Sequence, residues 1–456
     1  MLSEGRRTVP QVGPVLLSRY DVAIPRYTSY PAVPDWTGGI DAAAWREHLH
    51  SLDGSAAPLA LYVHLPFCAS RCLYCGCNAT VTKRAEVVDR YLNRLEREIA
   101  MLAQAIGRGP RVAEMHWGGG TPNFLDANQL TRLVAMLRAA FAIDADTECS
   151  IEADPRLVSP GQLRQLRDLD FSRISFGVQD FDADVQEAIG RIQPAAMIAD
   201  VVTEARAAGF EGINFDLIYG LPRQTAEGFE RTVAETLALS PDRVACFGYA
   251  HVPWMRPHQK RIDAAELPVS HARFTLFRRA VEQFMAAGYE WIGLDHFAKP
   301  DDPLARAAEA GTLHRNFMGY TTRVGEHLLG IGTSAISEVN GWYVQNPPEL
   351  GDWQRAVDAG ELMVARGHIL NEDDVLRGAA ITHLMCNGEL PDTLWVGGEA
   401  DLRARFEGFA TDGLVTFQEQ RVRVTALGRF FVRNLCAALD AYRSSADGPS
   451  RFSRAV

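Results

Sequence analysis

Four of the eight cysteines of this chain lie close together in the run CASRCLYCGC, as Cys68, Cys72, Cys75 and Cys77. Clustered cysteines in a reducing compartment are more often metal ligands than disulfide partners. Zinc sites usually use paired C-x-x-C units separated by a longer insert, or add histidines, so the compact C-x3-C-x2-C spacing matches zinc poorly. Three thiolates on one short loop instead fit three irons of a cubane cluster. The loop therefore predicts one 4Fe-4S cluster whose fourth iron needs an outside ligand.

The elements that must position this loop are predicted from short β-branched runs that alternate with amphipathic helical patterns. The candidate strands are 61–66, 112–117, 148–153, 173–178, 212–219 and 243–250, and the candidate helices are 85–104, 127–141, 194–209 and 226–239. Six βα units in series predict an α/β protein with a parallel sheet, either doubly wound or curved into a full or partial barrel.

Chemically notable residues follow the predicted strands, at the ends where a parallel sheet gathers its reactive groups. In chain order they are Cys68, Gly118 to Thr121, Glu152, Gln179, Asp216, and Ala250 with His251. The glycines of WGGGTP (117–122) let backbone groups approach a ligand closely, although turn formation alone also explains them. Asp216 is likewise explained by capping of the next helix. Together these residues predict one site at the carboxyl edge of the sheet.

The chain divides into three predicted parts: 1–57, an N-terminal extension that wraps the active site; 58–345, the catalytic barrel; and 346–456, a small C-terminal domain. In the last part we expect a helix over 371–386, a hairpin over 412–425 and a helix over 426–443. This order is typical of a winged-helix-like domain, which raises the question of DNA binding. Because the chain is acidic, a packing or lid role is favoured.

The composition limits the class of protein and its partners. With 47% hydrophobic and 23% charged residues in 456, the chain is globular, and the fibrous and disordered classes are excluded. The 46 basic and 57 acidic residues give a net charge of −11, so no overall positive field can hold nucleic acid or an anionic membrane. The sequence has no secretory signal and no apolar stretch long enough to span a membrane, so we expect a cytoplasmic protein.

The cysteine loop after the first strand, with Tyr74 before its third cysteine, resembles the hallmark of the radical S-adenosylmethionine (SAM) superfamily. Within that superfamily the chain resembles the oxygen-independent coproporphyrinogen III oxidases. The matching stretches are C-x3-C-x2-C-x-C, LYVHLPFC (61–68), SIEADP (150–155), FGVQDF (176–181), DLIYGLP (216–222), HRNFMGYTT (314–322), PRYTSYP (25–31) and FSRAV (452–456). The resemblance spans nearly the whole chain, and the fourth cysteine and N-terminal extension distinguish it from the haem-chaperone-like branch.

The resemblance implies a partial (β/α)6 TIM-like barrel that converts coproporphyrinogen III to protoporphyrinogen IX. The propionates of rings A and B become vinyls by way of a 5′-deoxyadenosyl radical, so no side chain is predicted to be catalytic beyond this cofactor radical. Cys68, Cys72 and Cys75 would ligate the cluster, and Cys77 would not. Two molecules of SAM are implied. The positions that match the cluster-bound SAM are Tyr62, Gly119, Glu152 and Ile336, and those that match the second are Tyr74, Gly120, Thr121, Gln179, Arg191, Asp216 and Ala250.

The substrate of that reaction carries four propionates, which require positive charge near the barrel mouth. We select Arg26 and Arg315 as candidates because a guanidinium group pairs with a carboxylate through two hydrogen bonds. Surface or structural roles are equally compatible with both. One departure from the family pattern is Met318, where the family has glutamine; a methionine is apolar and adaptable and cannot replace the hydrogen bonds of an amide.

The expected partners are coproporphyrinogen III and an electron donor such as a flavodoxin or ferredoxin, with no nucleic acid and no membrane. We expect a monomer. Two other functions stay open: a haem-binding, chaperone-like radical SAM protein, and a radical SAM enzyme that transfers a methyl or methylene group to another substrate. The first predicts tight haem binding without product, and the second predicts SAM consumption without change in the tetrapyrrole.

Overall fold

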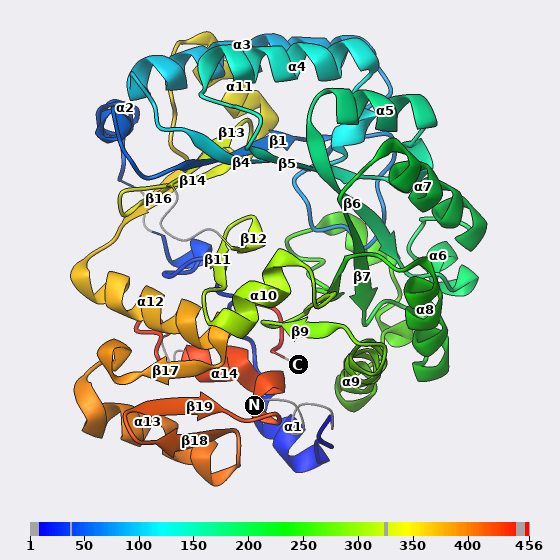
Figure 1. The fold of residues 1–456 in the computed structure, drawn as a ribbon, viewed down its shortest axis with the longest axis vertical. Coiled ribbons are helices and arrows are strands. Elements are labelled where there is room, and N and C mark those ends of the chain that lie inside the picture. The colour runs from blue at the N-terminus through cyan, green and yellow to red at the C-terminus, as the bar shows by residue number, and fades with distance from the viewer. Residues whose placement is uncertain (1–8, 37–38, 323–326, 444–451, 456) are drawn as a thin grey trace.

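A long curved sheet forms the centre of the molecule and bends round from β16 at one edge to β9 at the other (Figure 1). The computed structural model describes residues 9–36, 39–322, 327–443 and 452–455. The parallel strands, in their order across the sheet, are β13 (His327–Ile331), β1 (Leu59–Leu65), β4 (Val112–Gly119), β5 (Glu148–Ala153), β6 (Phe171–Gln179), β7 (Gly212–Tyr219) and β8 (Arg243–Gly248). All the predicted strands are therefore confirmed, with small shifts at their ends.

Antiparallel strands extend both edges of this parallel core. Beyond β13 lie β14 (Ile336–Val339), β15 (Trp342–Gln345) and β16 (Arg366–Ile369), and beyond β8 lie β10 (His296–Ala298) and β9 (Glu290–Ile292). The two edges do not pair with each other, so the sheet is a barrel with one open side. This arrangement confirms the predicted partial barrel.

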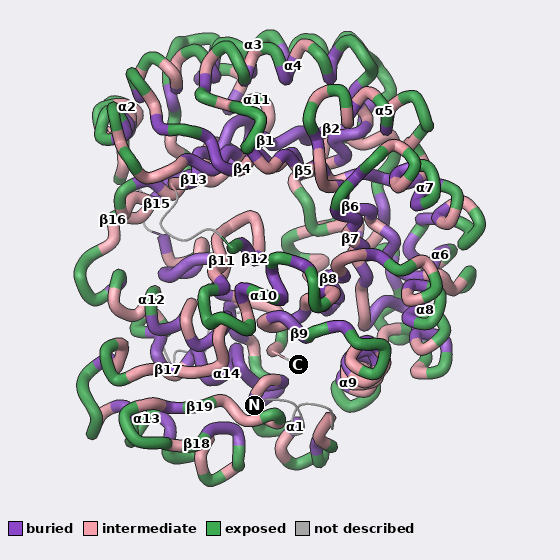
Figure 2. The backbone as a smooth tube through the Cα atoms, in the orientation of Figure 1, coloured by how far each residue is buried: buried purple, intermediate pink, exposed green. Residues whose placement is uncertain are grey.

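Helices cover the outer, convex face of the sheet (Figure 1). They are α3 (Ala85–Ile106), α4 (Ala127–Ala140), α5 (Pro160–Asp168), α6 (Ala183–Ala188), α7 (Ala195–Ala208) and α8 (Ala226–Leu239), followed by α9 (Ser270–Ala286). In α3 the buried side chains recur at three- and four-residue intervals, as Val88, Leu92, Leu95, Ile99 and Leu102 do. Figure 2 shows the result: the outer turns of α3 and α4 are exposed and the strands beneath are buried.

The open side of the barrel faces a layer built from the C-terminal part of the chain. This layer contains α12 (Glu372–Asn387), α13 (Gly398–Thr411), α14 (Val432–Ala437) and a small antiparallel sheet of β17 (Glu389–Pro391), β19 (Arg421–Val424) and β18 (Val415–Gln418). The helix predicted over 371–386 is present as α12, and the hairpin predicted over 412–425 is present as β18 and β19. That they form a winged-helix-like domain stays a prediction. The hairpin of β11 (His314–Asn316) and β12 (Gly319–Thr321) lies between this layer and the barrel (Figure 1).

The predicted helix over 426–443 is wrong. The chain forms a short 3-10 turn over Gly428–Phe431 and then the six-residue α14, which ends at Ala437. Every residue from Phe430 to Ala437 is buried, so this segment has no solvent-facing side, and contacts with neighbouring segments override its helical pattern.

The N-terminal segment and the C-terminal end lie against each other beside the barrel's open side (Figure 1). Ala23 pairs with Arg454 in an isolated antiparallel bridge, and the Tyr27 hydroxyl donates to the Asp440 carboxylate at 2.9 Å. Helix α1 (Pro14–Tyr20) is held to the C-terminal layer by the ion pair between Arg19 and Asp412 at 2.6 Å. None of the helices in the described ranges is long and apolar enough to cross a membrane.

Candidate active site

The carboxyl ends of the parallel strands surround a chamber of about 700 Å³. The cysteine loop forms one wall, and the ends of β4 to β8 form the others. Of the residues predicted from the sequence, the wall contains Arg26, Cys68, Cys72, Tyr74, Cys75, Gly119, Gly120, Thr121, Glu152, Gln179, Arg191, Asp216 and Ala250. The chain thus brings together groups that lie far apart in sequence, as expected for a site at the carboxyl edge of a barrel.

Backbone contacts with neighbouring segments hold the cysteine loop in place. Leu73 donates its N–H to the carbonyl of Ile189 at 2.9 Å. On the opposite side, Gln259 donates to the carbonyl of Tyr74 at 2.8 Å, and the His258 ring lies 2.7 Å from the carbonyl of Cys75. The loop is therefore fixed from both sides before any ligand binds.

The cysteine thiols differ in environment. Burial raises the pKa of Cys68 to about 11, and its sulfur lies 3.3 Å from the Thr121 hydroxyl. Hydrogen bonding with Cys77 lowers the pKa of Cys75 to about 6, with help from Arg71 and Arg191, and the same interaction raises the pKa of Cys77. Cys75 is thus more readily converted than Cys68 or Cys77 to the thiolate that a metal requires.

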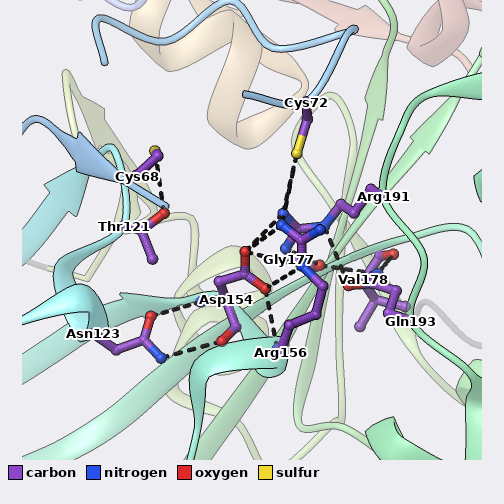
Figure 3. A network of polar contacts seen from close by, with 10 residues as sticks. All are labelled: Cys68, Cys72, Thr121, Asn123, Asp154, Arg156, Gly177, Val178, Arg191 and Gln193. Carbon is purple, nitrogen blue, oxygen red and sulfur yellow. Dashed lines mark hydrogen bonds and ion pairs between the residues drawn. The ribbon is translucent and has the colours of Figure 1, made fainter. Parts of the chain in front are cut away.

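An arginine and carboxylate network supports the loop from below (Figure 3). Asp154 accepts from Arg156 at 2.6 Å and from Arg191 at 3.1 Å, and the Arg191 guanidinium also lies 3.4 Å from the sulfur of Cys72. Burial raises the pKa of the Asp154 carboxyl, but these two partners outweigh it and the net shift is downward. The network thus places the guanidinium groups of Arg191 and Arg156 beside the sulfur of Cys72.

The glycines at the end of β4 let the strand backbone lie close to two neighbouring groups, the His64 ring and the backbone of Pro66. Gly119 has φ +111°, and a Cβ there would lie 2.5 Å from the His64 ring. A Cβ on Gly120 would lie 2.7 Å from the backbone of Pro66. The strand end is therefore pressed against the segment that leads into the cysteine loop, and the Gly120 N–H donates to the carbonyl of Leu65 at 2.9 Å. The N–H of Gly119 donates to Glu152 at 3.0 Å.

Glu152 and Asp216 supply acceptors on the chamber floor. Burial alone would raise the pKa of Glu152. The contact with His116 at 3.5 Å and the hydrogen bond from the Gly119 N–H outweigh burial, so the pKa of Glu152 is lowered overall. Burial and the neighbouring charge of Glu152 raise the pKa of Asp216 to about 6, although Ser175 donates to it at 3.0 Å. Both carboxylates can accept hydrogen bonds from the hydroxyl and ammonium groups of a ligand.

The donor set fits a cubane cluster better than a single ion. In the described ranges, no three histidine, cysteine or acidic side chains stand close enough to enclose one metal ion. A cubane attaches each thiolate to a different iron, so its ligands stand farther apart than those of zinc. Three cysteines that line one chamber but do not converge on a point match that requirement, and the glycine strand end and Glu152 beside them suit a polar ligand such as SAM.

Three predicted residues do not line the chamber. Tyr62 lies within β1 with its hydroxyl 3.1 Å from His64, and Ile336 lies at the start of β14. Arg315 points toward α12, where its guanidinium lies 2.9 Å from the sulfur of Met385. It also donates to the carbonyl of Arg26, in the N-terminal segment, at 3.3 Å. The prediction that Arg315 lies at the chamber mouth is therefore wrong. Its position on β11 directs its side chain toward α12 in the C-terminal layer.

Sequence reasoning did not assign His64, Asp154 or the pair His258 and Gln259, all of which support the loop or the strand end. Asp154 belongs to the quoted SIEADP stretch, so its signal was present. His64 lies two residues after Tyr62, and His116 lies two residues after Glu114. On a strand this spacing places the two residues of each pair on the same face. His258 and Gln259 lie on a loop with no periodicity, and no sequence signal could have found them.

The curved sheet and the cysteine loop at its carboxyl edge define a radical SAM protein, and residues 62–235 match the model of the radical SAM superfamily. The chain is 42% identical to the oxygen-independent coproporphyrinogen III oxidase of Pseudomonas aeruginosa over 97% of its length and 98% of that relative. It is 40% identical to the Escherichia coli enzyme over 97% of this chain and 98% of that one. The solved structure of coproporphyrinogen III oxidase from Escherichia coli superposes with a TM-score of 0.88, covering 92% of this chain and 98% of that chain. The chain belongs to the oxygen-independent coproporphyrinogen III oxidases, which are radical SAM enzymes of haem biosynthesis.

Proposed function

We propose that this chain oxidatively decarboxylates the propionates of rings A and B of coproporphyrinogen III to vinyls, with one 4Fe-4S cluster and two molecules of SAM. Each propionate would lose a hydrogen atom to a 5′-deoxyadenosyl radical, its carboxylate as CO2, and one electron to a one-electron acceptor. The observation that carries the proposal is the single chamber into which the cysteine loop, the glycine end of β4 and the carboxylates of β5 and β7 all open. This reaction requires the cluster, SAM and a propionate of the substrate to meet in one place, and one shared chamber provides such a place.

Cys68, Cys72 and Cys75 would hold the cluster, and Cys77 would stay free. When bound, the cluster and SAM supply a 5′-deoxyadenosyl radical that abstracts hydrogen from an unactivated propionate carbon. Arg191 and Arg156, which contact the sulfur of Cys72, would hold that side chain in position. The chain contributes positioning and exclusion of water, and none of its acids or bases needs to transfer a proton in this step.

We propose two SAM sites at this chamber. The Gly119 backbone and Glu152 would hold the cluster-bound molecule, with Tyr62 and Ile336 acting from the strands behind. Gln179, Arg191 and Asp216, on the other side of the chamber, would hold the second. The remaining positions assigned to this second site are Tyr74, Gly120, Thr121 and Ala250.

The substrate contacts, the electron donor, the oligomeric state, the cellular location and the domain division of this chain are also proposals. Arg26, on the chamber wall, would pair with a propionate, whereas Arg315 would act through Arg26 and the neighbouring Asp295. A one-electron carrier such as a flavodoxin or ferredoxin would reduce the cluster. We propose a cytoplasmic monomer whose parts 1–57, 58–345 and 346–456 serve as extension, catalytic barrel and C-terminal domain.

The cysteine assignment is tested by anaerobic reconstitution of single alanine variants. Cys68→Ala, Cys72→Ala and Cys75→Ala should each lose most of the bound iron and the visible absorption of the cluster. Cys77→Ala is the matched control from the same loop and should keep both. Loss of the cluster in Cys77→Ala, with retention in any of the other three, would overturn the ligand assignment.

A further inference from the structure

Basic residues gather around the cysteine loop although the whole chain carries a net charge of −11. Two stretches, 66–84, which contains the loop, and 252–262, contain no aspartate and no glutamate. Both contain arginine and lysine. The basic side chains that are exposed in these two stretches are Arg71, Lys83, Arg84, Lys260 and Arg261. The surroundings of the loop are therefore locally positive on an acidic protein.

Hydrogen bonds place these cations beside both ends of the cysteine loop. Lys83 and Arg84 directly follow Thr82, which donates its N–H to the carbonyl of Cys68 at 3.0 Å. Lys260 and Arg261 end the 3-10 turn Pro257–Arg261. In the same turn the His258 ring lies 2.7 Å from the carbonyl of Cys75. One group of cations thus lies near Cys68, the other lies near Cys75, and Arg71 belongs to the loop between them.

The five cations are not neutralised by carboxylates. Within the described ranges none of them forms an ion pair; the acceptor of Arg71 is the uncharged carbonyl of Ala79, at 2.5 Å. Two carboxylates on neighbouring elements are already engaged, since Arg223 pairs with Glu187 at 3.4 Å and with Glu266 at 3.1 Å. Exposed charges without partners act on a charged partner over a Debye length, about 8 Å at physiological ionic strength.

Exposed apolar side chains lie among these cations. Trp254 and Met255, just before the 3-10 turn, are 62% and 60% exposed. Val81 and Leu157 are exposed where they line the chamber beside the loop, and Ile192 is exposed next to Arg191. Exposed apolar groups bordered by charged residues mark interaction surfaces, and tryptophan is the residue most often found at the centre of a protein interface. The cations and these apolar groups form one surface, which we call the loop face.

We propose that the loop face is the docking surface of an acidic one-electron carrier protein. The inference rests on the proposed function, because that reaction needs a reduced cluster. The carrier gives up one electron, which reduces the cluster by one, and no atom is transferred. Electron-transfer partners form small, transient contacts, and complementary charges speed their encounter. The positive loop face, with Trp254 as an apolar anchor, suits such an acidic partner.

The test measures binding of a flavodoxin and of a ferredoxin, both acidic carriers, to the reconstituted full-length protein by surface plasmon resonance. The double variant Lys83→Glu, Lys260→Glu reverses one charge near each end of the loop and should slow association by about 10-fold or more at low salt. At 1 M salt, where the Debye length is about 3 Å, the variant and the wild type should associate at similar rates. Trp254→Ala should speed dissociation by about 10-fold at both salt concentrations.

The matched control is Arg306→Glu on α10 (Pro303–Ala310), at the side of the barrel that faces the C-terminal layer (Figure 1). Arg306 is exposed and, within the described ranges, forms no ion pair, so the change in charge is the same as at Lys83 or Lys260. This variant should bind both carriers as the wild type does.

Further measurements separate carrier docking from other roles of the loop face. With dithionite, a small reductant that needs no docking surface, the double variant should form 5′-deoxyadenosine at a rate close to that of the wild type. Its affinity for coproporphyrin III and its melting temperature should be unchanged.

Four results would overturn the inference: no salt-dependent binding of either carrier to the wild type, equal association of the double variant and the wild type, an equal loss in Arg306→Glu, or a loss of coproporphyrin III binding in the double variant. Binding to anionic lipid vesicles in place of both carriers would also overturn it. If the wild type forms no 5′-deoxyadenosine with dithionite, the proposed function fails instead.

Discussion

Gly119→Ala is the substitution for which the chamber gives the sharpest expectation. Gly119 has φ +111°, and the new Cβ would lie 2.5 Å from the His64 ring. His64 cannot move aside freely, because its ring is held by the carbonyl of Asn78 at 3.0 Å and the Tyr62 hydroxyl at 3.1 Å. A non-glycine residue in such a conformation costs about 1–3 kcal/mol, and the forced contact adds about 1–3 kcal/mol, so we expect about 3 kcal/mol of destabilisation.

Calorimetry converts this figure into a shift that can be measured. An unfolding entropy of about 2.1 cal/mol/K per residue corresponds to about 1 kcal/mol/K for 456 residues, so the melting temperature should fall by about 3 °C. Displacement of the Gly119 N–H from Glu152 should also weaken SAM binding by about 10-fold or more, as titration calorimetry would record.

The matched control for this prediction is Gly161→Ala in α5. A Cβ there would meet nothing closer than the Ser159 hydroxyl oxygen at 4.0 Å, and the backbone is helical. Alanine should be neutral or stabilise by about 0.5–1 kcal/mol. If Gly119→Ala and Gly161→Ala behave alike in melting and in SAM affinity, the reasoning about the strand end is refuted.

Three other variants test separate parts of the structure. Burial raises the pKa of Glu98 to about 7, so the folded protein holds this proton more tightly than the unfolded chain does. Stability should therefore fall as the pH rises from about 4.5 to 7. In Glu98→Gln, melting temperatures measured across this pH range should fall less steeply. Met318→Gln, beside a polar cavity of about 210 Å³, should change product yield only modestly, and a rise from near zero to full turnover would contradict this. Arg191→Lys should lower the melting temperature more than Arg138→Lys does, because the Arg138 pair with Asp170 is exposed; equal shifts would count against the buried network.

Much of the fold could be predicted because its signals are local. The strand 212–219 and the helix 226–239 match β7 and α8 residue for residue, since β-branched runs and three- and four-residue spacing dominate those segments. The single helix expected over 426–443 does not form for the opposite reason: residues 430–437 are buried on all sides, and long-range contacts decide the shape of that stretch. Helices α5 and α6 are short and were not recognised among their loop-like neighbours.

The site residues likewise divide into those that local sequence signals can place and those that only long-range packing places. Cys68, Glu152 and Asp216 could be placed from sequence because each lies on or just after a recognisable strand, and parallel strands end at one edge. Arg315 could not, because the direction of a side chain on the β11–β12 hairpin depends on how that hairpin lies against α12.

The most direct test of the central claim is one anaerobic assay. The reconstituted protein is mixed with reductant, SAM and coproporphyrinogen III, and 5′-deoxyadenosine and protoporphyrinogen IX are quantified together. We predict about two molecules of 5′-deoxyadenosine per protoporphyrinogen IX, one for each propionate that becomes a vinyl. Formation of 5′-deoxyadenosine with no change in the tetrapyrrole would contradict the assignment of this chain's substrate.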